Sequence, residues 1–219
     1  MSQSTLDYRL PRKCMLQKQL EATGIVDCAV LDSMARVPRH AFVPEAFVSA
    51  AYEDRSLPIG HGQTISQPKV VAWMCQLLEA KRGMSVLEIG TGSGYQAAVL
   101  QAMGLVVFSV ERLAPLYWEV KDLFERLGLR NIRTFLSDGT LGWPDMAPFD
   151  RIIVTAGGPG IPETLTDQLT DPGILVMPVG KRRGSQQLVR IIKDKGNLRI
   201  EKHGAVAFVD LVGDYGWAK

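Results

Sequence analysis

Short apolar runs alternate with helical patterns through most of the chain. From residue 84 onward, runs rich in β-branched side chains alternate with segments whose apolar residues recur every three or four positions. Such alternation is typical of parallel strands joined by crossover helices. The strands are expected at residues 85–89, 106–110, 132–136, 151–155 and 174–179. The pattern therefore predicts an α/β fold with a mostly parallel central sheet and helices on both faces.

The clearest helical pattern lies between the second and third predicted strands. Apolar side chains at positions 113, 116, 117, 120, 123, 124 and 127 fall on one continuous helical face. Pro115 in the first turn and Gly128 after the last one fit the two ends of such a helix. This segment is expected to cover the sheet as a crossover helix.

The two ends of the chain follow other patterns. Short helices are predicted at residues 15–23 and 28–36, followed by a loop-rich stretch over 38–67 and a helix that begins near Pro68. Long loops in compact domains are often functional. Near the other end, segments 187–192 and 198–202 flank a turn and predict a C-terminal antiparallel hairpin.

Length and composition indicate an ordinary globular protein. The chain has 219 residues, of which 46% are hydrophobic and 22% charged, which fits one hydrophobic core. A net charge of +2 offers no broad basic surface, and the basic cluster 181–183 is interpreted as a solvated loop. We therefore expect no nucleic-acid partner. We also expect a monomer and one domain over residues 1–219.

Membrane, disulfide and metal sites are not expected either. Residues 1–10 lack an apolar signal-peptide core, and no run of about 18 apolar residues occurs, which predicts a cytoplasmic protein without a membrane partner. Three cysteines, at positions 14, 28 and 75, fit neither a disulfide framework nor a zinc pair and are expected to be reduced. The three histidines lie far apart, so no metal site is predicted.

A glycine-rich turn follows the first predicted strand. Residues 85–95 are interpreted as a buried strand and a turn that contains Gly90, Gly92 and Gly94, leading into a helix over 96–103. Glycines let the backbone turn sharply and let a ligand approach atoms that a Cβ would block. The order of strand, glycine turn and helix therefore predicts a nucleotide-cofactor site.

The spacing of these glycines distinguishes between cofactors. A dinucleotide site requires G-x-G-x-x-G or a final alanine, whereas Tyr95 occupies the last of these positions. The G-x-G-x-G form preceded by an acidic residue, here Glu88, resembles the S-adenosylmethionine loop of methyltransferases. We therefore expect S-adenosylmethionine as methyl donor, with Glu88 and the three glycines in its site.

Acidic residues after the next two strands strengthen this prediction. Glu111 ends the second strand, 21 positions after Gly90, where a carboxylate can accept both ribose hydroxyls. A solvent-facing carboxylate of this kind would bind the ligand but contribute little packing. Asp138 follows the third strand, where it can accept from the adenine amino group while Gly139 leaves room for the ring. The alternatives are a solvated acid for Glu111 and a plain Asx turn for Asp138.

Four segments of the chain resemble one known family. They lie at residues 37–44, 57–68, 87–95 and 147–156. Together they resemble the protein-L-isoaspartate (D-aspartate) O-methyltransferases over nearly the whole chain. The resemblance implies a Rossmann-like S-adenosylmethionine-dependent methyltransferase fold, with residues 81–219 as its core and residues 1–80 as a helical cap and covering loop. It implies a repair enzyme that methylates the free α-carboxylate of L-isoaspartyl residues in damaged proteins and peptides.

The resemblance also assigns roles to individual residues. It implies that Ser66 is catalytic and that Gln63, Thr64 and Ile65 beside it close over the cofactor, which Ser66 also contacts. From the residues alone, Ser66 is an equally good candidate to cap the helix that begins near Pro68, and both roles are compatible.

Two residues depart from the family pattern near the C-terminus. Asp210 stands where members usually have proline, and Ala207 stands where bacterial members often have arginine. Because this segment is expected to help form the peptide groove, the departures bear on peptide preference. If Asp210 faces the groove, its charge should disfavour acidic peptides.

The same fold also supports other functions. Enzymes that methylate base amino groups resemble one another in an Asn/Asp-Pro-Pro-aromatic motif after the fourth strand, which stacks on a flipped base. Residues 155–159 here are small and lack an aromatic side chain, which disfavours a nucleic-acid methyltransferase. A non-catalytic adaptor that binds the cofactor and recognises proteins remains a rival that a turnover assay would separate.

Overall fold

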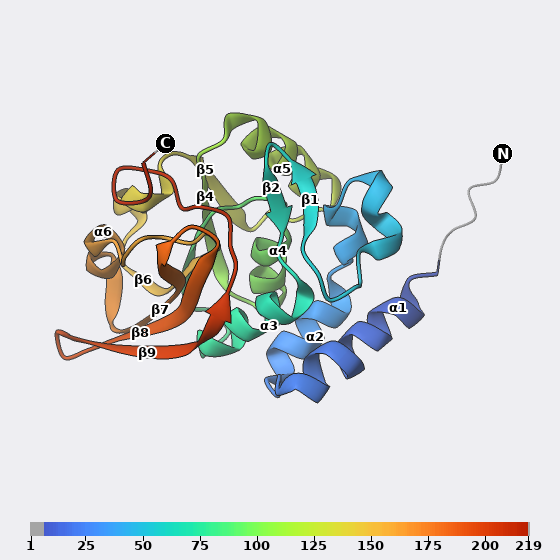
Figure 1. Cartoon of the computed structure of the whole chain (residues 1–219), viewed down its shortest axis with the longest axis horizontal. Helices are drawn as coiled ribbons and strands as arrows, with labels where there is room; N and C mark the ends of the chain where they lie inside the picture. Colours follow the sequence, from blue (N-terminus) through green and yellow to red (C-terminus); the bar gives the residue numbers. More distant parts are fainter. Residues whose placement is uncertain (1–6, 219) are drawn as a thin grey trace.

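The central sheet has seven strands in the order β5-β4-β3-β6-β7-β8-β9 (Figure 1). The computed structural model describes residues 7–218, so residues 1–6 of the N-terminal stretch and Lys219 lie outside it. The strands are β3 (Ser85–Ile89), β4 (Val106–Glu111), β5 (Ile132–Leu136), β6 (Phe149–Val154), β7 (Leu169–Arg182), β8 (Ser185–Asp194) and β9 (Asn197–Val206). Neighbours from β5 to β7 are parallel and the last two pairs are antiparallel, which confirms the predicted fold class.

The later strands are longer than the sequence predicts. β7 begins five residues before the predicted start. The sequence predicts a later start because Pro172 and Gly173, which lie within the strand, are typical of a turn. β8 and β9 form the predicted hairpin around a two-residue turn of Lys195 and Gly196, whose φ angles are 50° and 76°. Positive φ at both positions matches the twist of a tight hairpin turn.

Helices cover the two faces of the sheet unequally. The regular helices after the N-terminal segment are α2 (Cys28–Arg36), α3 (Pro68–Leu77), α4 (Tyr95–Ala102), α5 (Ala114–Arg126) and α6 (Glu163–Asp167). The first four pack on the face that carries Val86, and α6 packs on the face that carries Leu87. Short 3₁₀ turns at Gly139–Leu141 and Pro144–Met146 follow β5.

The N-terminal third contains more regular structure than expected. The predicted helix 15–23 is the continuation of α1 (Arg9–Cys14) through a π turn, and the stretch 38–67 contains two 3₁₀ turns. It also contains a separate antiparallel hairpin, β1 (Leu57–Gly60) and β2 (Gln63–Ile65). Strands of three or four residues are too short for their alternation to be recognised in the sequence.

The N-terminal segment completes the core on one face of the sheet. Met15, Leu20 and Met34 are fully buried in the same apolar cluster as Val86 of β3 and Ile153 of β6. The cap and the sheet therefore share a continuous core. Among residues 7–218, no helix combines the length and the apolar character needed to cross a bilayer.

The shared core predicts that cap and sheet unfold together. Met34→Ala should lower the free energy of unfolding by about 2–5 kcal/mol, because the cavity left by a large buried side chain is only partly filled by relaxation. Denaturant unfolding monitored by far-UV circular dichroism and tryptophan fluorescence should give one coincident transition. Val26→Ala, at a 76% exposed position, serves as the control and should shift it little. Two separate transitions would contradict a single domain.

Candidate active site

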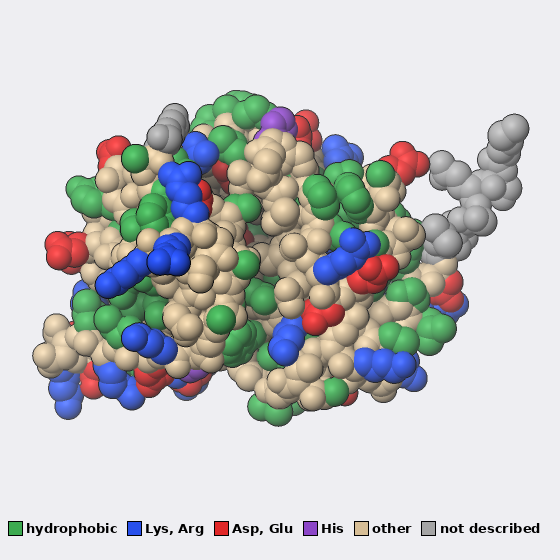
Figure 2. All heavy atoms as spheres, viewed as in Figure 1, with side chains coloured by type: hydrophobic (Ala, Val, Ile, Leu, Met, Phe, Trp, Pro, Cys, Tyr) green, Lys and Arg blue, Asp and Glu red, His purple; other side chains and the backbone are tan. Residues whose placement is uncertain are grey.

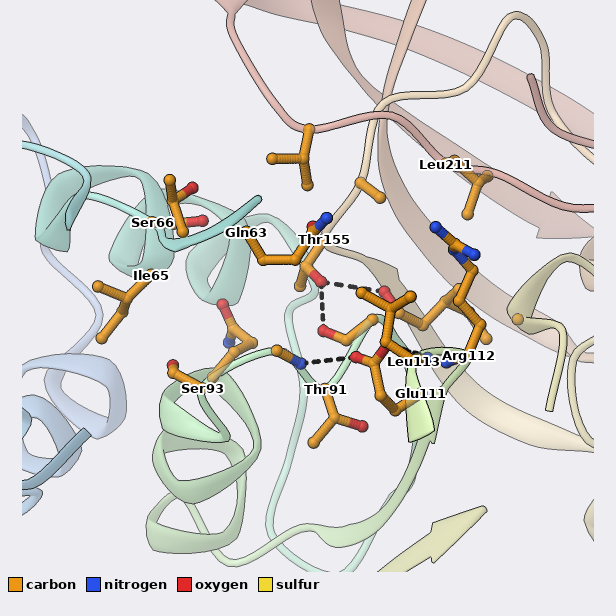
Figure 3. Close-up of a pocket in the computed structure, with 18 of the residues that line it drawn as sticks. Gln63, Ile65, Ser66, Thr91, Ser93, Glu111, Arg112, Leu113, Thr155 and Leu211 are labelled. Atoms are coloured by element: carbon orange, nitrogen blue, oxygen red, sulfur yellow. Dashed lines mark hydrogen bonds between the residues drawn. The ribbon is translucent and has the colours of Figure 1, made fainter. Parts of the chain in front are cut away.

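A cavity lies at the carboxyl ends of β3, β4 and β6, and some of its lining residues are drawn in Figure 3. The chain leaves β3 toward β4 on one side and returns to β6 on the other, and ligands of open α/β sheets bind at such a reversal. About 870 Å³ of space, partly open to solvent, lies between its walls. Drawn with all atoms, the face seen in Figure 1 has a hollow near its middle (Figure 2).

The glycine turn after β3 forms one wall of the cavity. Gly90, Gly92 and Gly94 have φ angles of 95°, 52° and 81°, which favour glycine at each position. Gly90 and Gly92 line the cavity, whereas Gly94 does not. A Cβ at Gly94 would lie 2.5 Å from the Phe124 ring of α5. Gly94 therefore allows α4 and α5 to pack closely, and its contribution to the site is indirect.

Glu111 ends β4 with its carboxylate beside the glycine turn (Figure 3). One carboxylate oxygen accepts from the Gly92 amide at 3.0 Å, and the other accepts from the amides of Arg112 and Leu113 at 2.9 Å each. The residue is only 5% exposed. The expectation of a solvent-facing carboxylate with little structural role is therefore wrong, because three backbone amides at the strand end depend on it.

Glu88 lies beneath the glycine turn and does not line the cavity. It is fully buried, and one oxygen accepts a hydrogen bond from the Ser109 hydroxyl, which is itself 2.6 Å from the Thr91 hydroxyl. The other oxygen has no hydrogen-bond partner among the described residues. Burial raises the pKa of Glu88 to about 8. Any action of Glu88 on a ligand would pass through Thr91, which does line the cavity.

Asp138 and Gly139 follow β5 and occupy different positions relative to the cavity. Gly139 lines it, and a Cβ there would lie 2.5 Å from Ile89. The Asp138 carboxylate accepts from the amide of Thr140 at 2.8 Å and from the amide of Asp214 at 2.8 Å. These bonds tie β5 to the C-terminal segment. Asp138 is outside the cavity lining, so its contact with adenine stays a prediction.

The segment from Gln63 to Ser66 forms the wall opposite Glu111 (Figure 3). It consists of β2 and the connection to α3. All four residues of the segment, including Thr64 and Ile65, line the cavity. Gln67, not Ser66, occupies the N-cap of α3, and no side chain caps that helix. Within residues 7–218 no protein group bonds to the Ser66 hydroxyl, so the capping interpretation is not realised.

A second groove adjoins the cavity, and Ser66 lines both. Thr64, Thr155 and Val209 are also shared between them. A ligand in the cavity and another in the groove would therefore meet beside Ser66 and the other shared residues. Among the described residues that line the groove, Lys69 is the one with a charged side chain.

The two departures from the family pattern lie on different surfaces. Ala207 lines the groove, but Asp210 lines the cavity and its carboxylate lies 3.1 Å from the Arg183 guanidinium. Asp210 is therefore paired, and its charge does not face the groove. The residues of the basic cluster 181–183 are all exposed, as expected, and Arg183 also donates to the Ala218 carbonyl at 2.6 Å.

Comparison with known proteins decides the family. The family model described as protein-L-isoaspartate(D-aspartate) O-methyltransferase matches residues 12–216. The chain belongs to this family. A protein-L-isoaspartate O-methyltransferase of Desulfosudis oleivorans is 49% identical over 99% of this chain and 98% of its own, and one of Geobacter metallireducens is 48% identical over 97% and 98%.

Solved structures of the same family agree with the fold. A protein-L-isoaspartate O-methyltransferase superposes with a TM-score of 0.85 at 30% identity, over 94% of this chain and 67% of its own. A structure from Plasmodium falciparum, described as a putative protein-L-isoaspartate O-methyltransferase in complex with S-adenosyl-L-homocysteine, has a TM-score of 0.78 at 26% identity over 92% and 98%. S-adenosylmethionine is accordingly the methyl donor of this methyltransferase.

Sequence reasoning missed a polar residue that the cavity and the groove share. Thr155 follows β6 and lines both cavity and groove, and its hydroxyl donates to the carbonyls of Ile89 at 3.0 Å and Gly90 at 2.6 Å. It fixes the glycine turn from the side opposite Glu111. The sequence does contain a signal for Thr155. It is the last residue of the predicted strand 151–155 and directly follows β6, and ligands of open α/β sheets bind at the carboxyl ends of strands where the strand order reverses.

Loss of Glu111 is expected to affect both binding and stability. Glu111→Ala leaves three backbone amides without their acceptor, which should lower the free energy of unfolding by about 1–3 kcal/mol. It should also weaken binding of S-adenosylhomocysteine in isothermal titration calorimetry. Glu125→Ala on the exposed face of α5 is the control. Unchanged affinity with lowered stability would leave Glu111 a purely structural role.

The buried Glu88 predicts a specific pH dependence of stability. Its pKa rises from 4.5 to about 8 on folding, so the folded state holds a proton that the unfolded state releases. The resulting stabilisation is complete below about pH 4.5 and is lost as the pH rises toward 8. Glu88→Gln should flatten this part of the profile and be more stable than the parent at pH 8. Chemical denaturation from pH 5 to 8 measures it, and a parent profile as flat as that of the variant would refute an elevated pKa.

Proposed function

We propose that the protein transfers the methyl group of S-adenosylmethionine to the free α-carboxylate of L-isoaspartyl residues in damaged proteins and peptides. Membership of the family supports this activity, and it favours a protein over a nucleic acid as the acceptor. The observation that carries the proposal is the position of Ser66, which lines both the cavity and the adjoining groove.

The cavity fits the cofactor. Gly90 and Gly92 present backbone without side chains, and Gly139, where a Cβ would lie 2.5 Å from Ile89, lets the chain after β5 approach β3 closely. Glu111 uses its two oxygens for three amides, and a carboxylate has about four acceptor positions, which leaves one position for a ribose hydroxyl. When bound, S-adenosylmethionine supplies a methyl group on a positively charged sulfur, which a carboxylate oxygen can accept as both charges are neutralised.

The residues around the cofactor divide into direct and supporting roles. Gln63, Thr64, Ile65 and Ser66 would cover it from the β2 side, as residues of the cavity wall. Gly94 and Glu88 would support the glycine turn from outside the cavity. Asp138 would hold Gly139 in place, and its proposed bond to adenine requires the carboxylate to accept one further hydrogen bond.

The acceptor needs no general base. In an isoaspartyl residue the chain runs through the side-chain carbonyl, and the free α-carboxyl has a reference pKa of roughly 3.3–3.7, so it is ionised at neutral pH. The protein must supply alignment, which is worth ~7 to 11 kcal/mol when reacting groups are held in place. Ser66 supplies it by donating its hydroxyl to the carboxylate.

Location and assembly remain predictions from the sequence. A cytoplasmic, monomeric protein is expected, and size-exclusion chromatography with light scattering would measure the assembly. Neither property enters the chemistry proposed for the site.

Replacement of Ser66 should impair turnover more than cofactor binding. Ser66→Ala is expected to lower kcat on an isoaspartyl peptide by about tenfold or more, because a misaligned carboxylate reacts slowly. The dissociation constant of S-adenosylhomocysteine should change little. Ser56→Ala is the matched control, because Ser56 lines the groove but not the cavity. Equal losses in the two variants would remove Ser66 from the chemistry.

The same assay tests the substrate and the absence of a base. Two peptides that differ only in an aspartyl or isoaspartyl linkage should differ in methylation, with the isoaspartyl peptide strongly preferred. Turnover should show no rate-controlling protein ionisation between about pH 6 and 8. Equal methylation of both peptides would refute the substrate, and binding of S-adenosylhomocysteine without any methylation would indicate a non-catalytic binder.

A further inference from the structure

Arg39 is a fully buried cation in the 3₁₀ turn Arg39–Phe42, outside both the cavity and the groove. No carboxylate among the described residues forms an ion pair with it. Removing a charged side chain from water is costly, and well-packed apolar residues can often replace buried ion pairs without loss of stability. Packing alone therefore does not account for an arginine at this position, and its hydrogen bonds must.

The hydrogen bonds of Arg39 join segments that are far apart in the sequence. Its Nη2 donates to the carbonyl of Ser66 at 2.7 Å, and its Nε donates to the carbonyl of Ala51 at 2.7 Å. Its guanidinium lies over the ring of Tyr95, 4.9 Å from the centroid. Tyr95 is the first residue of α4, directly after Gly94, and it lines the cofactor cavity.

The geometry of these contacts fixes the Ser66 backbone relative to the glycine turn. A hydrogen bond to the Ser66 carbonyl restrains the rotation of that peptide group, and with it the direction of the attached side chain. The charged, planar guanidinium suits such a role because its donors have a fixed arrangement. Tyr95 directly follows the glycine turn, so the contact with its ring connects Arg39 to that wall of the cavity.

We propose that Arg39 is a positioning residue, which sets the distance and direction of the Ser66 hydroxyl relative to the bound methyl donor. The inference rests on the proposed function, because it assumes that Ser66 aligns the acceptor. Displacement of a reacting group by about 1 Å can lower a rate 100-fold. Loss of Arg39 therefore lowers kcat, although Arg39 contacts neither the cofactor nor the acceptor peptide.

The test compares two buried arginines that both donate to backbone carbonyls. Arg151 is 9% exposed and donates to the carbonyls of Leu78 and Glu79, at the opposite end of the sheet from the cavity. Arg39→Lys should lower kcat by about tenfold or more, with at most about a threefold change in the dissociation constant of S-adenosylhomocysteine. Arg151→Lys should lower the melting temperature about as much as Arg39→Lys does, but it should leave kcat within about twofold of the parent value.

A double-mutant cycle with Ser66→Ala separates positioning from general damage. If Arg39 acts through Ser66, Arg39→Lys should cost less than about threefold in kcat once the hydroxyl is absent, since residues in one network are not additive. An undiminished loss in the Ser66→Ala background, or a kcat equal to that of Arg151→Lys, would overturn the inference. Should Arg39→Lys fail to fold, Arg39→Gln, a neutral donor without a buried charge, takes its place in the same cycle.

Failure of the inference and failure of the proposed function give different results. If the parent protein does not methylate the isoaspartyl peptide, the proposed function itself is refuted. If the parent is active and the cycle is additive, Ser66 keeps its role and only the positioning by Arg39 is refuted.

Discussion

The carboxylate of Glu111 is the interaction on which the cofactor site depends. It ends β4 and accepts from the amides of Gly92, Arg112 and Leu113, so one side chain connects the glycine turn with the start of α5. Thr155 fixes the other side of the turn through the carbonyls of Ile89 and Gly90. Parallel strands bring these ends to one edge of the sheet, but the two polar side chains give the turn its shape.

The second wall of the site depends on the N-terminal third of the chain. β2 and the connection to α3 carry Gln63 to Ser66, and they rest on the core that Met15, Leu20 and Met34 share with the sheet. The wall is therefore anchored through apolar packing and through Arg39. This arrangement explains how a hairpin of short strands, β1 and β2, holds a defined position over the cavity.

The sequence predicts the parts of the structure that rest on periodicity and on glycine spacing. The bounds of β3, β5 and α2 match the predicted ranges, because each is a short, regular segment between clear turn signals. β1 and β2 were missed because they are too short to show alternation, and β7 was shortened because Pro172 interrupts the apolar run.

Within the site, the sequence identifies residue types at strand ends but not their orientation. Gly90, Gly92 and Gly139 line the cavity as expected, whereas Gly94 faces Phe124 and the Asp138 carboxylate bonds to Thr140 and Asp214. The position of Asp210 in the sequence suggests a groove residue, whereas its carboxylate pairs with Arg183. Such partners come from distant segments, so no local pattern reveals them. The buried ionisable groups Glu88 and Arg39 likewise stand outside the cavity, as expected if the chemistry needs a rigid frame and no proton transfer by the protein.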